Sequence, residues 1–312
     1  MSENIKRQKQ LWKLIQKGNY VKLEAFLESD ISSSMELVNM RHKAAGDSVI
    51  HLSSRHGFLD LVEYFHKIWN VSLYLKNLDG KTPLHEASAN GHFDVAKYLL
   101  DCDVPVDSLK ISDWTPLMLA CTKEGNIKVV DLLVSSGANI HLINKDGWNC
   151  FHISCRLGDV DMVNYLLNLD GLIWKTVSNN GRTPLHTAAM HGKKEVLDIL
   201  MQKCDSRLDE QDSCGSTPLM EAVKGGHLHL AKNLIRNGAR IEKLDNLGRN
   251  VLHIAAECGK MDVIKYLVLE CHMDPNARPD FEANFSHTAL DWARKEDQMG
   301  AVEVLVNLGA VG

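Results

Sequence analysis

The sequence predicts an all-α solenoid of helix-turn-helix repeats with β-hairpin fingers between them. Three observations lead to this prediction. A tetrapeptide recurs at nearly constant spacing, a glycine follows most copies at a fixed distance, and apolar residues recur at helical spacing. Each such repeat can bury its apolar face only against its neighbours. We therefore expect one elongated cooperative domain over 1–312, although the length alone would suggest two.

The tetrapeptide sets the period of the chain. Its copies read SVIH, TPLH, TPLM, NCFH, TPLH, TPLM, NVLH and TALD, and successive ends are 34, 33, 34, 34, 34, 33 and 38 residues apart. A threonine at its start predicts a helix N-cap, and a proline after it takes the first helical position, where no amide donor is lost. The copies end at His51, His85, Met118, His152, His186, Met220, His253 and Asp291.

The rest of each repeat is predicted to form two short helices and a turn. In 82–100, Leu84, Val95 and Leu99 recur at helical spacing and give the two helices apolar faces. Glycines lie between the helices, where a helix end favours a left-handed residue. These are Gly91, Gly158, Gly192, Gly226 and Gly259. Asp-Gly and Asn-Gly pairs at 79–80, 146–147 and 180–181 predict the tight turns before the next repeat.

This pattern resembles the ankyrin repeat, whose 33-residue period and T-P-L-H-x-A motif it carries. The resemblance covers nearly the whole chain and implies an ankyrin-repeat solenoid. We expect an N-terminal capping repeat over 11–41, ankyrin repeats over 42–278, and a degenerate C-terminal repeat over 279–312. In the last copy, Asp291 replaces the histidine and Asp297 replaces the glycine between the helices.

Composition and charge disfavour several classes of function. The net charge of -5 gives no global positive field, so we expect no direct binding to nucleic acid. The N-terminal segment lacks the apolar run of a secretory signal, and no apolar stretch has the length of a membrane span. The eight cysteines form no CxxC pair, which favours a reducing compartment. We expect a monomer in the cytoplasm, with the nucleus as an alternative.

The histidines of the tetrapeptide are the first candidates for chemistry. Their recurrence with the period favours a structural role, hydrogen-bonding the backbone between repeats, over metal binding or catalysis. The sequence has no HExxH, paired-carboxylate, GxSxG or phosphate-binding motif. We therefore expect a protein-binding surface, with no catalytic residues, no metal and no cofactor.

Tryptophans depart from the repeat in the turns. Trp114 and Trp148 stand four residues before the tetrapeptide end in two adjacent repeats, and Trp174 lies in the next turn region. The other copies have Lys81, Arg182, Ser216 and Arg249 at this position, which suggests that it faces solvent. Two interpretations remain open: local packing of each ring on its own turn, or a row of partner-binding anchors.

Lysines occur in the same turns, and solubilising charge or a functional role would each explain them. They are Lys76, Lys110, Lys145, Lys175 and Lys243. The segments "DWTPLMLACTK", "NKDGWNCFHIS" and "WKT…RTPLHTAAMHG" depart from the ankyrin consensus in a way that is similar to vertebrate ankyrin-repeat cofactors of alanyl-tRNA synthetase.

That closer resemblance implies a protein that binds the catalytic domain of alanyl-tRNA synthetase. It also implies that misactivated serine is transferred to lysine side chains, which suppresses serine mischarging without making the chain a turnover enzyme. The acyl acceptors fall on Lys145 in "NKDGW" and on Lys175 in "WKT". A third falls on Ile111, which leaves the neighbouring Lys110 as its substitute. The alternative is an ankyrin scaffold for another partner, with no covalent chemistry.

Overall fold

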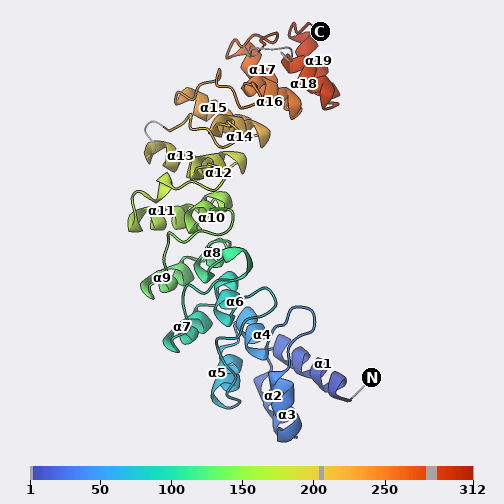
Figure 1. Cartoon of the computed structure of the whole chain (residues 1–312), viewed down its shortest axis with the longest axis vertical. Helices are drawn as coiled ribbons and strands as arrows, with labels where there is room; N and C mark the ends of the chain where they lie inside the picture. Colours follow the sequence, from blue (N-terminus) through green and yellow to red (C-terminus); the bar gives the residue numbers. More distant parts are fainter. Residues whose placement is uncertain (1–2, 204–206, 279–286, 312) are drawn as a thin grey trace. The chain divides into compact units, whose positions relative to one another are not determined.

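The computed structural model describes residues 3–203, 207–278 and 287–311 (Figure 1). Within these ranges the chain forms nineteen α-helices and two short 3-10 turns, which confirms the all-α fold class. It divides into two compact units, Met1–Ile153 and Ser154–Gly312. The expectation of a single cooperative domain, with the repeat boundaries given above, stays a prediction.

The first unit begins with three helices where the sequence predicted a two-helix cap. The additional helix α3 starts after Asp30, whose Oδ1 accepts a hydrogen bond from the Ser33 backbone N–H at 3.2 Å. The helices of this unit are α1 (Glu3–Gln16), α2 (Tyr20–Glu28), α3 (Ile31–Asn39), α4 (Val49–His56), α5 (Leu59–Lys67), α6 (Pro83–Asn90), α7 (Phe93–Asp101), α8 (Pro116–Ala120) and α9 (Ile127–Ser135), with a 3-10 turn η1 (Ile111–Asp113). Helix α10 (Cys150–Leu157) contains the boundary between the units.

In the second unit, first helices pack on first helices and second helices on second helices. Helix α12 packs against α14, α14 against α16, and α16 against α18, while α11 packs against α13. The helices are α11 (Val160–Leu169), α12 (Pro184–Met190), α13 (Lys194–Lys203), α14 (Pro218–Lys224), α15 (Leu228–Arg236), α16 (Val251–Glu257), α17 (Met261–Leu269), α18 (Ala289–Lys295) and α19 (Met299–Asn307), with a 3-10 turn η2 (Ile173–Lys175).

The glycines between paired helices adopt the predicted left-handed backbone. Gly91 ends α6 with φ of 76°, and Gly192 and Gly226 have φ of 70° and 77°. In the C-terminal repeat Asp297 takes this place with φ of 53°, a conformation that strains a residue bearing Cβ. The part of the insertion at 279–286 lies outside the described residues.

The histidine of the tetrapeptide links consecutive repeats. At the start of α6, the Thr82 backbone N–H donates to His85 Nδ1 at 3.0 Å, and Thr82 Oγ1 accepts from the His85 backbone N–H. Because Nδ1 accepts, the ring proton lies on Nε2, which donates to the Trp114 carbonyl of the following repeat at 3.2 Å.

The same bridge recurs within each unit. His51 Nε2 lies 2.8 Å from the Lys81 carbonyl, and His186 Nε2 lies 2.9 Å from the Ser216 carbonyl. These bonds confirm the structural role predicted for the tetrapeptide histidines. Burial lowers the pKa of His51 and His186, and it lowers the pKa of His85 to about 4.

Replacing His85 with methionine, which occupies this position at Met118 and Met220, is expected to reduce the pH dependence of stability. The unfolded chain binds the histidine proton more readily, so stability is complete above the ordinary pKa near 6.5 and falls as the pH drops toward about 4. At about pH 5 this one group costs about 2 kcal/mol. Urea unfolding at about pH 7 and about pH 5 measures the difference, and an unchanged pH dependence would contradict this origin.

Candidate functional site

The candidate site lies on the turns between repeats, here called fingers. A finger is the five-residue segment that starts eight residues before the end of a tetrapeptide. In the six described fingers from 77–81 to 245–249, the first residue's N–H donates to the fifth residue's carbonyl, at 2.9 to 3.0 Å. No described finger contains a strand, which corrects the predicted β-hairpins, because a single closing bond is too little for a ladder. The fingers are 77–81, 110–114 and 144–148 in the first unit, and 178–182, 212–216 and 245–249 in the second.

Neighbouring fingers of the first unit are joined through their backbones. The Ile111 N–H donates to the Asp79 carbonyl at 2.8 Å, and the Lys145 N–H donates to the Ser112 carbonyl at 3.0 Å. The second residue of each finger is therefore held by the finger before it. This contact fixes the Lys145 backbone while its side chain stays exposed.

Finger 144–148 is built around a buried amide. Asn144 Oδ1 accepts from the backbone N–H groups of Asp146 at 3.0 Å and Trp148 at 2.9 Å, and Gly147 supplies the left-handed backbone with φ of 77°. Trp148 is half-buried, and its ring centroid lies 5.9 Å from that of His152. Local packing thus accounts for part of the Trp148 surface, and a role in partner binding stays a prediction.

Finger 110–114 lacks both the side-chain cap and the glycine of the other fingers. Lys110 stands where Asn144 stands in the next finger, and Ser112 and Asp113 adopt φ of 65° and 60°. The half-buried Lys110 side chain donates from Nζ to the Ile111 carbonyl at 3.3 Å and lies 5.6 Å from the centroid of the half-buried Trp114 ring. Burial, followed by the charge of Lys81, lowers the pKa of Lys110.

The third expected acceptor position has no amine. Ile111 occupies the same finger position as Lys145 and is 58% exposed. The structure thus places an apolar side chain at this tip, with the Lys110 ammonium beside its carbonyl. Ile111 itself offers no nucleophile for acyl transfer.

Trp174 and Lys175 lie in the second unit, in turn η2 rather than in a finger. Buried Ile173 anchors the turn, whose Lys175 N–H donates to the Leu172 carbonyl at 2.9 Å. Lys175 Nζ lies 5.4 Å from the half-buried Trp174 ring, and the Arg207 guanidinium lies at the same distance. Trp174 therefore does not share the finger position of Trp114 and Trp148. Its ring instead makes cation–π contacts with Lys175 and with Arg207.

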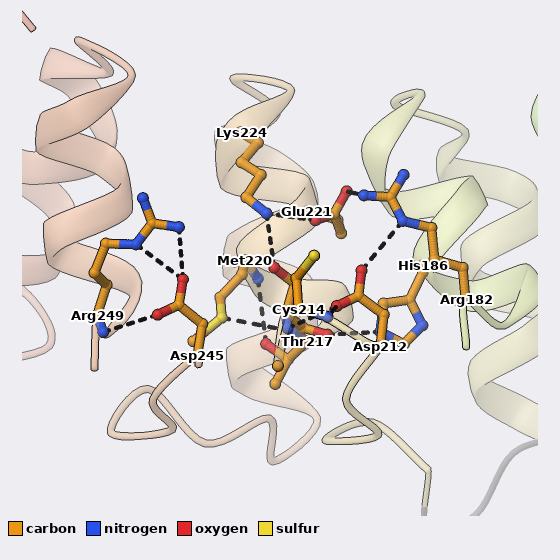
Figure 2. Close-up of polar contacts among 12 residues, drawn as sticks. Arg182, His186, Asp212, Cys214, Thr217, Met220, Glu221, Lys224, Asp245 and Arg249 are labelled. Carbon is orange, nitrogen blue, oxygen red and sulfur yellow. Dashed lines mark hydrogen bonds and ion pairs between the residues drawn. The ribbon is translucent and has the colours of Figure 1, made fainter. Parts of the chain in front are cut away.

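The fifth finger position is half-buried or buried rather than fully exposed, which corrects the sequence interpretation. Ser216 is 1% exposed, and Arg182 is half-buried. Figure 2 shows Arg182 reaching two buried carboxylates, with Nε 3.2 Å from Asp212 Oδ2 and Nη2 3.1 Å from Glu221 Oε2. Arg249 likewise lies 2.7 Å from Asp245 Oδ2. The cations at this position neutralise acids that have no access to water.

The two repeats that contain a finger tryptophan also have an apolar residue directly after the tetrapeptide. The residue after the tetrapeptide is Leu119 or Ile153 where Trp114 or Trp148 stands, and buried Glu86 or Glu221 in two other repeats, but Ile254 takes this place in the repeat of Arg249. The acidic residue in "TPLHE" and "TPLME" was the available sequence signal for this ion-pair row.

In the described part of the chain, no group of three or more histidine, cysteine, aspartate or glutamate side chains is arranged to hold a metal ion. Nor does any helix in those ranges have the length and apolar character needed to cross a membrane.

Comparison with known proteins identifies the repeat. A family profile described as "Ankyrin repeats (3 copies)" matches residues 11–109, 50–144, 117–212, 203–279 and 219–311. Among similar proteins, the ankyrin repeat protein nuc-2 of Neurospora crassa is 26% identical over 203 residues, covering 61% of this chain and 19% of that protein. The transient receptor potential cation channel subfamily A member 1 of Homo sapiens is 28% identical over 228 residues, covering 60% and 20%. The chain thus spans about a fifth of either relative.

A relative of similar size is the probable 26S proteasome regulatory subunit p28 of Saccharomyces cerevisiae. It is 28% identical over 208 residues, which cover 64% of this chain and 88% of that protein.

Replacing Arg182 with methionine is expected to destabilise the second unit by about 3 kcal/mol, because Asp212 and Glu221 keep their burial and lose their shared cation. The exposed pair of Lys194 and Asp198 provides the control, since Lys194→Met should cost less than about 0.5 kcal/mol. Denaturant unfolding of both variants measures the difference. Equal losses of stability in the two variants would show that the ion pairs of Arg182 with Asp212 and Glu221 contribute no more than a surface ion pair.

Replacing Asp113 with glycine is expected to stabilise the protein by about 0.5–1 kcal/mol, because glycine adopts the observed φ of 60° without strain. Gly147→Ala, at the equivalent position of the next finger, should destabilise by a similar amount. The midpoint of urea unfolding reports both changes. A destabilised Asp113→Gly variant would mean that the aspartate side chain contributes more than its backbone strain costs.

Proposed function

Because the chain belongs to the ankyrin repeat family, we propose that it is a protein-binding module that docks on the catalytic domain of alanyl-tRNA synthetase and accepts misactivated serine on its lysines. The segments around Trp114, Trp148 and Trp174 resemble those of ankyrin repeat domain-containing protein 16. Lys145 and Lys175 match its acceptor motifs, and Lys110 substitutes for the acceptor missing at Ile111. We place this function in the cytoplasm, and also in the nucleus.

One observation carries the proposal: Lys145 combines a fixed backbone with an exposed side chain. Its N–H is bonded to the preceding finger at 3.0 Å, and the finger beneath it is capped by buried Asn144. A partner protein that docks here thus meets a lysine whose backbone is already ordered. Pre-ordering lowers the entropic cost of presenting an amine to an acyl donor.

The chemistry is an acyl transfer from seryl-adenylate. The neutral lysine amine attacks the carbonyl carbon of the mixed anhydride, an amide bond forms, the bond to the phosphate oxygen breaks, and AMP leaves while the amine releases a proton to water. An ordinary lysine is only about 0.04% neutral at pH 7. A high effective concentration beside the activated carbonyl compensates for this low fraction. Each lysine is consumed in the step, so the chain acts as a stoichiometric acceptor.

Lys110 has a property that favours the same step. Its lowered pKa, caused by burial and the neighbouring charge of Lys81, increases the fraction of neutral amine at neutral pH. The contact with the Trp114 ring restricts the direction of the side chain. A larger fraction of Lys110 is thus available as the neutral amine, although its tip is less accessible than that of Lys145.

The double variant Lys145→Arg/Lys175→Arg is expected to lose most of the suppression of serine mischarging. Arginine keeps the charge for docking but stays protonated, so it offers no amine for acylation. The measurement is Ser-tRNA(Ala) formed by an editing-deficient synthetase, with and without the protein. Adding Lys110→Arg should remove the remainder.

The matched control is Lys76→Arg/Lys243→Arg, which changes two turn lysines outside the acceptor motifs and should behave as the unaltered protein. If the unaltered protein leaves Ser-tRNA(Ala) unchanged, the cofactor function is wrong. If the acceptor variant suppresses mischarging fully, docking occurs without acyl transfer.

The alternative is an ankyrin scaffold with no covalent chemistry. The range of similar proteins favours it, since a cation channel and a proteasome regulatory subunit share this repeat type. The same fingers would then serve for recognition of another partner. The two proposals differ in their product, because only acyl transfer leaves a seryl amide on a lysine.

A further inference from the structure

Helix α15 departs from the other second helices in its charge. In five of them the first turn contains a carboxylate, which favours the positive end of the helix dipole. These residues are Asp60, Asp94, Asp161, Glu195 and Asp262. At this position α15 has His229, and residues 222–240 contain four lysines and arginines but no aspartate or glutamate. Helices α9 and α19 also lack a carboxylate in the first turn, but each contains one acidic residue, Asp131 and Glu303, whereas α15 contains none.

The basic face of α15 forms one wall of an open groove. The groove has a volume of about 400 Å³ and lies between α13 and α15, lined by Lys194, Asp198, His229, Lys232, Asn233 and Arg236. The floor is ordered, since Asn233 Nδ2 donates to Asp198 Oδ1 at 2.5 Å. Three cations and one carboxylate line the groove, which leaves a net charge of about +2 on a chain whose total is -5.

The cations of the groove are only partly neutralised. Lys194 Nζ lies 3.2 Å from Asp198 Oδ2, and Lys232 Nζ lies 3.3 Å from Glu270 Oε1 and 4.4 Å from the centre of the Tyr266 ring. Arg236 is exposed and has no carboxylate partner in the part of the chain that the structure describes. The cations that line this open groove can therefore pair with an added anion.

The loop before α13 contains one further cation, Lys193. A Cβ on Gly192 would lie 2.6 Å from the His227 ring, so the loops before α13 and α15 touch. His191 lies in the first of these loops, and its pKa is lowered by burial and then by the charges of Arg156, Lys193 and His227.

We propose that the groove between α13 and α15 binds an acidic peptide segment of a protein partner. Carboxylates of such a segment would pair with Lys194, Lys232 and Arg236, while Asn233 and His229 provide hydrogen bonds for its backbone. A short peptide fits better than nucleic acid, because the chain is acidic as a whole and the groove has three cations where nucleic-acid sites use about 6–10 phosphate contacts. This site is independent of the fingers and of the function proposed for them.

The test uses a fluorescein-labelled peptide of about ten residues with alternating glutamate and serine, and a matched peptide with glutamine for glutamate. Fluorescence anisotropy at about 50 mM and about 200 mM NaCl should show binding of the glutamate peptide alone, weaker at the higher salt. The variant Lys194→Gln/Lys232→Gln/Arg236→Gln should weaken binding about tenfold.

The control variant is Lys67→Gln/Lys97→Gln/Lys128→Gln, which removes three exposed lysines from α5, α7 and α9 of the first unit. It changes the net charge equally and should alter binding less than about twofold. A thermal melt checks that each variant folds, and the single exposed change Arg236→Glu tests the groove if the triple variant does not. Equal binding of both peptides, no binding, an equal loss in the control, or tighter binding of a uridine decamer would each overturn the proposal.

Discussion

The carbonyl oxygen of the fifth finger residue accepts two hydrogen bonds, and the position of the finger depends on both. One bond closes the finger, and the other connects it to the preceding repeat. The Trp114 oxygen accepts from the Lys110 N–H, which closes its own finger, and from His85 Nε2 of the repeat before it. The Lys81 and Ser216 oxygens are used in the same way by His51 and His186. Because each histidine must stay neutral to accept at Nδ1 while it donates from Nε2, a shift of a finger would break its bond to the histidine that caps the preceding repeat's helix.

This coupling separates the roles of backbone and side chain in the candidate site. The finger backbones are fixed by bonds that any residue can make, so individual tip residues are free to change without loss of the fold. Leu78, Ile111 and Lys145 occupy the same tip position in successive fingers and are all exposed. A lysine at such a tip is presented by an ordered scaffold, whereas Lys110 at the cap position becomes half-buried and loses part of its affinity for a proton.

The sequence predicted the features that depend on local chemistry. The threonine caps, the structural histidines and the left-handed glycines each follow from residues within one repeat. The predictions from the sequence failed where the environment of a side chain depends on a neighbouring repeat. The period showed that Arg182 and Trp148 share a finger position, but the half-buried Arg182 pairs with Glu221 of the following repeat, which the period does not reveal. Likewise, the pKa of Lys110 is lowered by burial and then by the charge of Lys81 in the preceding finger.

The most direct test of acyl transfer is mass spectrometry of the protein after incubation with alanyl-tRNA synthetase, serine and ATP. The acceptor mechanism predicts lysine peptides heavier by one seryl group at Lys145 and Lys175, with a further adduct at Lys110 and none when the synthetase or ATP is omitted. Unmodified lysines under conditions where the two proteins bind would contradict acyl transfer and leave the fingers as a recognition surface alone.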